Sequence, residues 1–145
     1  MILLTGAAGY VGSHLAFKLI KSNIPFIGID NFSTKNQYNK IYYKIKNVDI
    51  GDKKKILKLI SKYKIQDVIH TAAYSYPVES EIKKIKNKKN NYIKTMAFIE
   101  CFQDKKINSF IFLSSSNVYS ENKNTTYKEN DNTYSKNLYG KYKFK

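Results

Sequence analysis

The chain has 145 residues, of which 42% are hydrophobic and 14% aromatic. These values exclude a disordered or fibrous protein and leave room for one domain with a real core. The apolar runs are too short to cross a membrane, and Met1 stands directly before the first predicted strand, so neither a membrane span nor a signal peptide is expected. The single cysteine, Cys101, excludes an internal disulfide and suits a cytoplasmic protein.

The net charge of +15 raises the question of nucleic-acid binding. All 26 basic residues are lysines, although arginine is the usual reader of phosphates and bases. The lysines are also spread along the chain rather than gathered in one arm. We interpret the charge as a solvated surface in a chain with a compositional bias toward Lys, Asn, Ile and Tyr, and we expect no nucleic-acid partner.

Short apolar runs alternate with helical patterns, which is typical of a parallel sheet covered by helices on both faces. The predicted strands are residues 2–4, 25–30, a third that ends at Val48, a fourth that starts with 67–70, and 110–113. The predicted helices are residues 10–22, one that starts after Asp52, one that ends near Phe102, and two turns from Leu138. Right-handed crossovers then give a doubly wound α/β sheet of the Rossmann type. We expect residues 1–145 to form one such domain, incomplete at its C-terminal end.

Two polar stretches stand out between these elements. Residues 83–91 are rich in lysine and asparagine, and residues 121–137 offer few candidates for a core. Both are predicted to be poorly ordered. The second is long for a loop in a compact domain, which favours a functional or mobile segment.

Three glycines follow the first predicted strand and open the first helix. Gly6, Gly9 and Gly12 stand where a dinucleotide-binding turn requires them, because glycine permits the tight turn and a close approach of the backbone to a pyrophosphate. Asp30 ends the second predicted strand. A carboxylate at that position accepts hydrogen bonds from ribose hydroxyls and repels a 2′-phosphate, so NAD is predicted in preference to NADP.

A tyrosine and a lysine lie four residues apart in the last predicted helix, and therefore on one face. In Tyr139 and Lys143 a neighbouring ammonium would lower the pKa of the phenol, which is near ~10 when unperturbed. Ser115, after the fifth strand, can hydrogen-bond the same substrate oxygen. Tyr42 and Lys46 have the same spacing within a predicted strand, so position in the chain favours the first pair as the catalytic candidate.

The order of the segments TGAAGYVGSH, DNFSTKN, Asp49-Ile50, VIHTAAYS, SSSNVY and YGKYK resembles the extended short-chain dehydrogenase/reductase family, above all its members that epimerise UDP-glucose. The resemblance covers the whole chain but only about the first half of such an enzyme. Matched by position, the cofactor-binding residues that it implies are Gly6, Gly9, Tyr10, Val11, Gly12, Asp30, Asn31, Phe32, Ser33, Thr34, Lys35, Asp49, Ile50, Thr71, Ala72, Ala73, Tyr74, Ser75 and Asn91, together with Ser115, Tyr139 and Lys143 as the catalytic group.

The resemblance implies an NAD-dependent isomerase that interconverts UDP-glucose and UDP-galactose. In such enzymes a tyrosinate takes the proton of the sugar 4-hydroxyl while hydride passes to NAD, and hydride then returns to the other face of the 4-keto sugar. The family's dehydratases carry an Asp-Glu pair where this chain has Ser116 and Asn117, which disfavours dehydration. Epimerases and decarboxylases of UDP-glucuronate remain an alternative. A UDP-sugar substrate and a homodimer of the full-length protein are also implied.

Two interpretations of the chain itself remain open. We expect either an N-terminal fragment of a longer enzyme or an inactive, cofactor-binding remnant, and in both cases the 145 residues alone should lack epimerase activity and bind NAD weakly or not at all. The two histidines, His14 and His70, stand in unrelated contexts and suggest no metal site.

Overall fold

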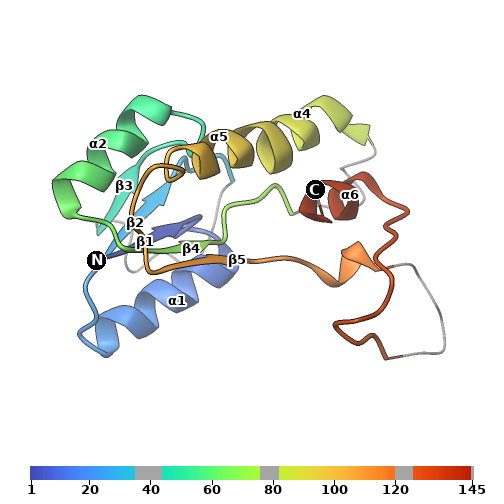
Figure 1. Cartoon of the computed structure of the whole chain (residues 1–145), viewed down its shortest axis with the longest axis horizontal. Coiled ribbons are helices and arrows are strands. Elements are labelled where there is room, and N and C mark those ends of the chain that lie inside the picture. The colour runs from blue at the N-terminus through green and yellow to red at the C-terminus, as the bar shows by residue number, and fades with distance from the viewer. Residues whose placement is uncertain (35–43, 76–81, 120–125, 145) are drawn as a thin grey trace. The chain divides into compact units, whose positions relative to one another are not determined.

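The computed structural model describes residues 1–34, 44–75, 82–119 and 126–144, and Figure 1 shows its elements. Within these residues one parallel sheet has five strands in the order β3-β2-β1-β4-β5. The strands are β1 Ile2–Thr5, β2 Phe26–Asp30, β3 Ile45–Asn47, β4 Asp67–His70 and β5 Ser109–Phe112. The order reverses beside β1, which confirms the predicted doubly wound sheet of the Rossmann type.

The helices confirm most of the predicted bounds to within a few residues. They are α1 Tyr10–Lys21, α2 Lys53–Tyr63, α4 Lys84–Lys88, a π-helical segment Lys89–Ile93, α5 Lys94–Glu100, a 3₁₀ turn Ser116–Val118 and α6 Leu138–Phe144. Helix α2 begins where the side chain of Asp52 accepts a hydrogen bond from the backbone N–H of Lys55 at 3.1 Å, an N-cap that orients one apolar face toward the sheet.

Helices cover both faces of the sheet, with α1 on one side and α2 and α5 on the other (Figure 1). Successive residues of a strand point to opposite faces, so Leu3 and Leu4 enter two different cores. The larger core contains Leu3, Ile29, Val48, Ile50, Ile56, Leu59, Ile60, Ile65, Val68, Phe98, Cys101 and Phe102. The smaller core contains Leu4, Ala7, Ala8, Ala16 and Ile45. This two-sided burial holds β1 at the centre of the sheet.

The prediction of poor order for residues 83–91 is wrong, because residues 84–93 are helical. The composition alone does not indicate why these residues form a helix. Asn87 and Asn91 lie four residues apart with exposed fractions of 0% and 3%, and the Asn91 amide donates to the Asn87 side-chain oxygen. The neighbouring lysines are exposed, so the segment is an amphipathic helix whose buried face is made of amides.

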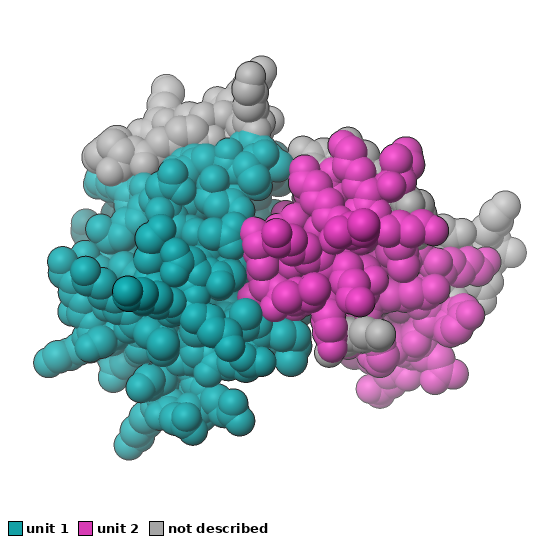
Figure 2. All heavy atoms as spheres, turned by 90° about the horizontal axis from the view of Figure 1, so that it is seen from above, with its two compact units in different colours: residues 1–72, 96–113 teal, residues 73–95, 114–145 magenta. Residues whose placement is uncertain are grey.

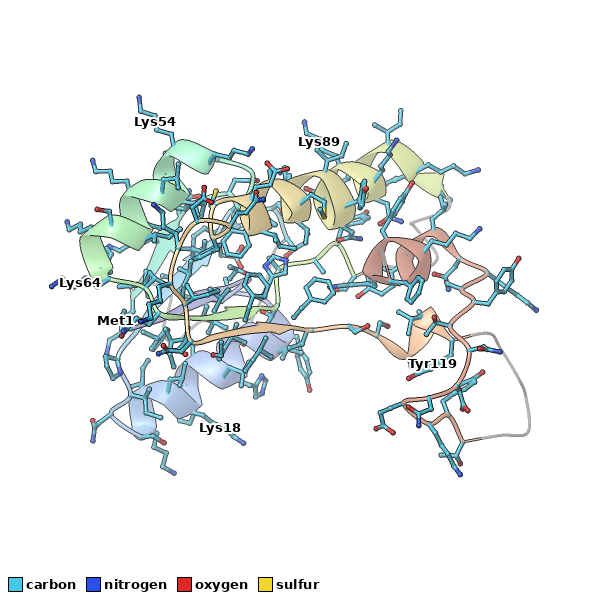
Figure 3. All side chains as sticks on the ribbon, viewed as in Figure 1. Met1, Lys18, Lys54, Lys64, Lys89 and Tyr119 are labelled. Atoms are coloured by element: carbon cyan, nitrogen blue, oxygen red, sulfur yellow. The ribbon has the colours of Figure 1, made fainter. Side chains whose placement is uncertain are left out.

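The chain divides into two compact units (Figure 2). Unit 1 comprises residues 1–72 and 96–113 and contains the sheet, whereas unit 2 comprises residues 73–95 and 114–145 and contains α4 and α6. Surface lysines occur in both units, and Lys18, Lys54, Lys64 and Lys89 are labelled in Figure 3, where their side chains extend away from the ribbon. No helix in the described part of the chain is long and apolar enough to span a membrane.

Candidate functional site

The glycine turn connects β1 to α1 in unit 1. Gly6 has a φ of +63°, and a Cβ there would lie 2.7 Å from the backbone of Ala72. A Cβ on Gly12 would lie 2.0 Å from the carbonyl oxygen of Gly6, which itself accepts the N–H of Gly9 at 2.9 Å. Glycine is therefore required at Gly6 by conformation and at Gly12 by close approach of the backbone.

Helix α1 begins directly after this turn. Its N-cap is Gly9, which offers no side-chain cap, and its first turn contains no acidic residue. Tyr10 and Val11, the first two residues of the helix, are 64% and 44% exposed. The positive end of the helix dipole and its first amide groups thus face a surface without a competing carboxylate from the helix itself.

Asp30, at the end of β2, is tied to the glycine turn. One of its carboxylate oxygens accepts the N–H of Ala8 at 3.0 Å, and the other accepts the N–H of Phe32 at 2.8 Å. Each oxygen has a second lone pair, so the carboxylate retains capacity to accept hydrogen bonds from hydroxyl groups. The residue predicted to select NAD therefore also holds the loop that would cradle its phosphates.

The segments after β2 and β3 are joined by an amide and a carboxylate. Asn31 donates from its side chain to Asp49 at 2.7 Å, and Asp49 also accepts the N–H of Gly51 at 2.8 Å. The Asn31 side-chain oxygen accepts the N–H of Ser33 at 3.0 Å, while Ile50 is buried. Thr34 is exposed, and Lys35 lies outside the described residues.

The carboxyl ends of β1 and β4 meet through Thr5. Its hydroxyl is 2.9 Å from Nδ1 of His70 and accepts the N–H of Ala72 at 3.2 Å. The hydroxyl of Thr71 donates to the Thr5 carbonyl at 2.7 Å. His70 is fully buried and stacked against Phe98, which assigns it to the core of this sheet edge.

The chemistry of this edge fits a dinucleotide. It combines a glycine turn after β1, beside which the strand order reverses, a helix N-terminus without an acidic cap, and carboxylates that follow the adjacent strands β2 and β3. The pyrophosphate would lie against Tyr10 and Val11, and the adenosine ribose would lie against Asp30.

Replacing Asp30 with asparagine is expected to destabilise the protein and to weaken discrimination against NADP. An amide has only one oxygen, so one of the two N–H groups from Ala8 and Phe32 loses its acceptor, at a cost of about 1–3 kcal/mol. Removal of the charge also removes the repulsion of a 2′-phosphate. Urea unfolding and the ratio of the Kd values for NADP and NAD measure both effects, with Asp104→Asn at an exposed position as the control. An unchanged ratio would contradict the assignment.

In unit 2 the predicted residues Tyr74 and Asn91 come together. The Asn91 side chain accepts the Tyr74 N–H at 2.7 Å and donates to the Tyr74 carbonyl at 3.0 Å, so it binds the chain as a neighbouring strand would. Tyr74 is buried and Ser75 is exposed, while Ala73 begins the unit. Asn91 thus fixes the segment that the resemblance assigns to the cofactor.

The three predicted catalytic residues also belong to unit 2. Ser115 precedes the 3₁₀ turn, and Tyr139 and Lys143 lie one turn apart on α6, each with an exposed fraction of 7%. The Ser115 hydroxyl acts on the Tyr139 phenol, whose pKa it lowers. The serine, tyrosine and lysine are therefore parts of one buried cluster, separate in the chain from the glycine turn of unit 1.

The electrostatics of the cluster differ from the sequence-based expectation. Burial raises the pKa of Tyr139, and the hydrogen bond from Ser115 opposes that effect. Burial also lowers the pKa of Lys143 to about 8, since desolvation disfavours the ammonium. Lys143 is not among the groups that shift the pKa of Tyr139, so the expected lowering by its ammonium is not found and burial is the largest influence.

Three residues that the sequence reasoning missed hold the cluster together. Asn137 caps α6 by accepting the N–H of Gly140 at 2.8 Å, and its side chain donates to Asn117 at 2.9 Å. A Cβ on Gly140 would lie 2.0 Å from the Asn117 carbonyl oxygen, so only glycine allows α6 to approach the 3₁₀ turn this closely. The preference of asparagine for helix N-caps was a signal for Asn137, whereas Asn117 carried none.

The fold and these two groups of residues define a Rossmann-type dinucleotide-binding protein with a Ser–Tyr–Lys cluster. The chain belongs to the NAD dependent epimerase/dehydratase family, whose sequence profile matches residues 2–145. The family's description names NAD as its cofactor, in agreement with the preference predicted from Asp30.

The relatives include an epimerase and a dehydratase, the two types of enzyme in the family's description. A UDP-glucose 4-epimerase of Caenorhabditis elegans is 32% identical over 134 residues, which are 81% of this chain and 38% of the relative. A dTDP-D-glucose 4,6-dehydratase of Dictyostelium discoideum is 33% identical over 127 residues, 81% of this chain and 29% of the relative.

Among solved structures, UDP-glucose 4-epimerase from Brucella ovis in complex with NAD superposes with a TM-score of 0.89 at 29% identity. The match covers 99% of this chain and 44% of that one. The chain therefore spans less than half the length of each of these three proteins.

Proposed function

We propose that this chain forms the NAD-binding and catalytic part of a nucleotide-sugar epimerase that inverts C4 and interconverts UDP-glucose and UDP-galactose. The observation that carries the proposal is the pair Tyr139 and Lys143, both buried and one helical turn apart on α6, with the 3₁₀ turn after Ser115 packed against that helix. The likeness to 4-epimerases in sequence and structure supports it.

In the proposed reaction Tyr139 accepts the proton of the sugar 4-hydroxyl and later returns one to the same oxygen. Ser115 has one proton to donate, to Tyr139 before the sugar binds and to the sugar 4-oxygen once that oxygen lies between the two hydroxyl groups. In the reaction, the ammonium of Lys143 would favour the ionised form of Tyr139 against the opposing effect of burial. When bound, NAD supplies a reversible two-electron oxidant for the sugar C4. The cluster thus needs to move only one proton in each direction.

Dehydration is the second activity found among the relatives, and the residues after Ser115 do not support it. Elimination of water needs an additional acid and base next to the catalytic hydroxyl, and Ser116 and Asn117 carry no carboxylate. The Asn117 amide is bonded to Ser115 and to Asn137. We therefore favour epimerisation, with UDP-glucuronate as the alternative substrate class.

The test is conversion of UDP-galactose to UDP-glucose, in the presence of NAD, by the full-length protein to which this chain is expected to belong, since the 145 residues alone are expected to lack turnover. Tyr139→Phe is expected to lower kcat by about 10²–10⁴-fold, because it removes a general base, while the Kd for NAD stays unchanged. Tyr134→Phe, at a position 68% exposed, is the matched control and should retain the full rate. A Tyr139→Phe variant with normal turnover would show that Tyr139 is not the general base. If the protein converts UDP-glucuronate and not UDP-galactose, UDP-glucuronate is the substrate instead.

A further inference from the structure

The 3₁₀ turn and α6 are linked by a chain of hydrogen bonds whose directions can be assigned one after another. It starts at the backbone N–H of Gly140, which can only donate, so the Asn137 atom 2.8 Å away must be an oxygen. The other polar atom of Asn137 is then its NH₂ group. That group donates to Asn117 at 2.9 Å, so the Asn117 atom that receives it must be an oxygen too.

The orientation of Asn117 follows and leads to Ser115. With its oxygen turned to Asn137, Asn117 directs its NH₂ group at the Ser115 hydroxyl oxygen, 3.2 Å away. The backbone N–H of Asn117 donates to the same oxygen, also at 3.2 Å. A serine hydroxyl has two acceptor sites and one proton to donate. Both acceptor sites of Ser115 are therefore filled by Asn117.

A serine whose acceptor sites are filled can only donate. Its proton is then left for the phenol oxygen of Tyr139, whose pKa the Ser115 hydroxyl lowers, as a donated hydrogen bond does. We propose that Asn117 and Asn137 are positioning residues which, through this directed chain from the Gly140 N–H, fix Ser115 as the hydrogen-bond donor to Tyr139. The roles of Ser115 and Tyr139 in catalysis rest on the proposed function, whereas the direction of the chain rests on the contacts alone.

The chain of hydrogen bonds controls which side chain receives the Ser115 proton, which packing alone does not do. A donated hydrogen bond stabilises the phenolate more than the phenol, whereas an accepted one does the reverse. If the two amides were reversed, the Ser115 proton would turn to the Asn117 oxygen, and Tyr139 would lose its donor. The elements that contact α6 carry Lys84, Lys86 and Lys88 on α4 and Lys89 and Tyr92 on the π-helical segment, and none of these groups lies in the chain of bonds.

The sharpest variant is Asn137→Asp. Aspartate is an equally good N-cap and interacts favourably with the helix dipole, so α6 should remain folded. Its carboxylate has no proton to donate, and it therefore forces the Asn117 amide to turn its NH₂ group toward residue 137. Ser115 then donates to Asn117 instead of to Tyr139. The ionisation of Tyr139 should move to higher pH.

The measurement is the ionisation of Tyr139 followed by NMR in protein labelled at tyrosine Cζ, with the resonance assigned by Tyr139→Phe. Because Asn137→Asp also adds a negative charge, the variant is made with Ser115 and with Ser115→Ala. The added charge changes the pKa of Tyr139 equally in both backgrounds, whereas the effect of the directed hydrogen bonds requires the serine. We expect a larger rise in the pKa of Tyr139 when Ser115 is present. Equal rises in both backgrounds, or none, would overturn the proposal.

Two further variants provide a second test and a control. Asn117→Ala empties one acceptor site of Ser115 and should raise the pKa of Tyr139 in the same direction, so it carries the test if Asn137→Asp does not fold. Asn130→Asp makes the same change of charge at an exposed turn and should leave Tyr139 unaffected.

Activity provides a separate readout. In Asn137→Asp the acid limb of the pH–kcat profile should shift to higher pH, so that the rate falls about tenfold near neutral pH and recovers in base. A purely structural defect would lower the maximum kcat and leave the pH of the acid limb unchanged. If the NMR result holds and no epimerisation is found, the directed chain stands and the proposed function fails.

Discussion

Replacing Gly12 with alanine in the full-length protein is expected to weaken NAD binding at least ~100-fold and to destabilise the protein by about 3 kcal/mol or more. The new Cβ would lie 2.0 Å from the Gly6 carbonyl oxygen and 2.8 Å from its carbonyl carbon. Both are backbone atoms of the turn itself, so no side chain can move aside to relieve the overlap. Helix α1 must shift away from β1, and the turn loses the geometry that brings its amides to a pyrophosphate.

Thermal or urea unfolding gives the loss of folding stability, and calorimetric titration gives the Kd for NAD, whose ~100-fold rise corresponds to about 3 kcal/mol of binding free energy. Gly9→Ala is the matched control in the same turn. A Cβ there would lie 3.1 Å from the Gly6 oxygen, and the φ of −71° suits any residue. Gly12→Ala with normal affinity, or with no greater effect than Gly9→Ala, would contradict the assignment of this turn.

Replacing Lys143 with methionine should abolish turnover and yet make the folded protein more stable at neutral pH. The pKa of Lys143 is lowered from 10.5 to about 8 because burial disfavours its ammonium, a difference that corresponds to a cost of about 3 kcal/mol. Methionine has a similar length and no charge, so it avoids this cost. A protein that retains a destabilising charge at such a site does so for function.

The pH dependence of stability follows from the same group. Between about pH 8 and 10.5 the unfolded chain still binds a proton at residue 143 that the folded chain has released. The free energy of unfolding attributable to Lys143 therefore rises with pH across this window, and the full cost is present below pH 8. The stability gain of Lys143→Met should be largest near pH 7 and should shrink toward pH 10.5.

Urea unfolding of the parent protein and the variant at several pH values measures this difference, in which the titration of other groups cancels. Lys141→Met, an exposed position on the same helix, is the control and should show little gain at any pH. A gain for Lys143→Met that does not depend on pH would show that packing, and not the buried charge, is responsible.

Local patterns predicted the sheet well, and they put the glycine turn and Asp30 at one edge of it, because these residues are close in sequence to the strands that carry them. The runs predicted as strands, residues 2–4 and 25–30, correspond to β1 Ile2–Thr5 and β2 Phe26–Asp30, and the three glycines lie where β1 meets α1. Asp30 was predicted from its position at a strand end. Parallel strands bring their carboxyl ends to one edge, so a position at the end of a strand already implies a place in the site.

Composition failed where burial involved amides. Residues 83–91 are mostly lysine and asparagine, and only the folded chain distinguishes the exposed lysines from Asn87 and Asn91, whose side chains bond to each other and, through Asn91, to Tyr74. The spacing of Tyr139 and Lys143 was informative, but the direction of their pKa shifts was not predictable, since it depends on how deeply α6 is buried.

The sequence by itself determined the alternation of strands and helices, the glycine turn with Asp30, and the candidates Ser115, Tyr139 and Lys143. These features depend on periodicity and on conformational preferences that act over a few residues. Only the tertiary structure decided that Asn117 and Asn137, distant in the chain, bond to each other and set the direction in which Ser115 donates. Hydrogen bonds between distant side chains depend on distances within a few tenths of an ångström, and those distances exist only once the chain has folded.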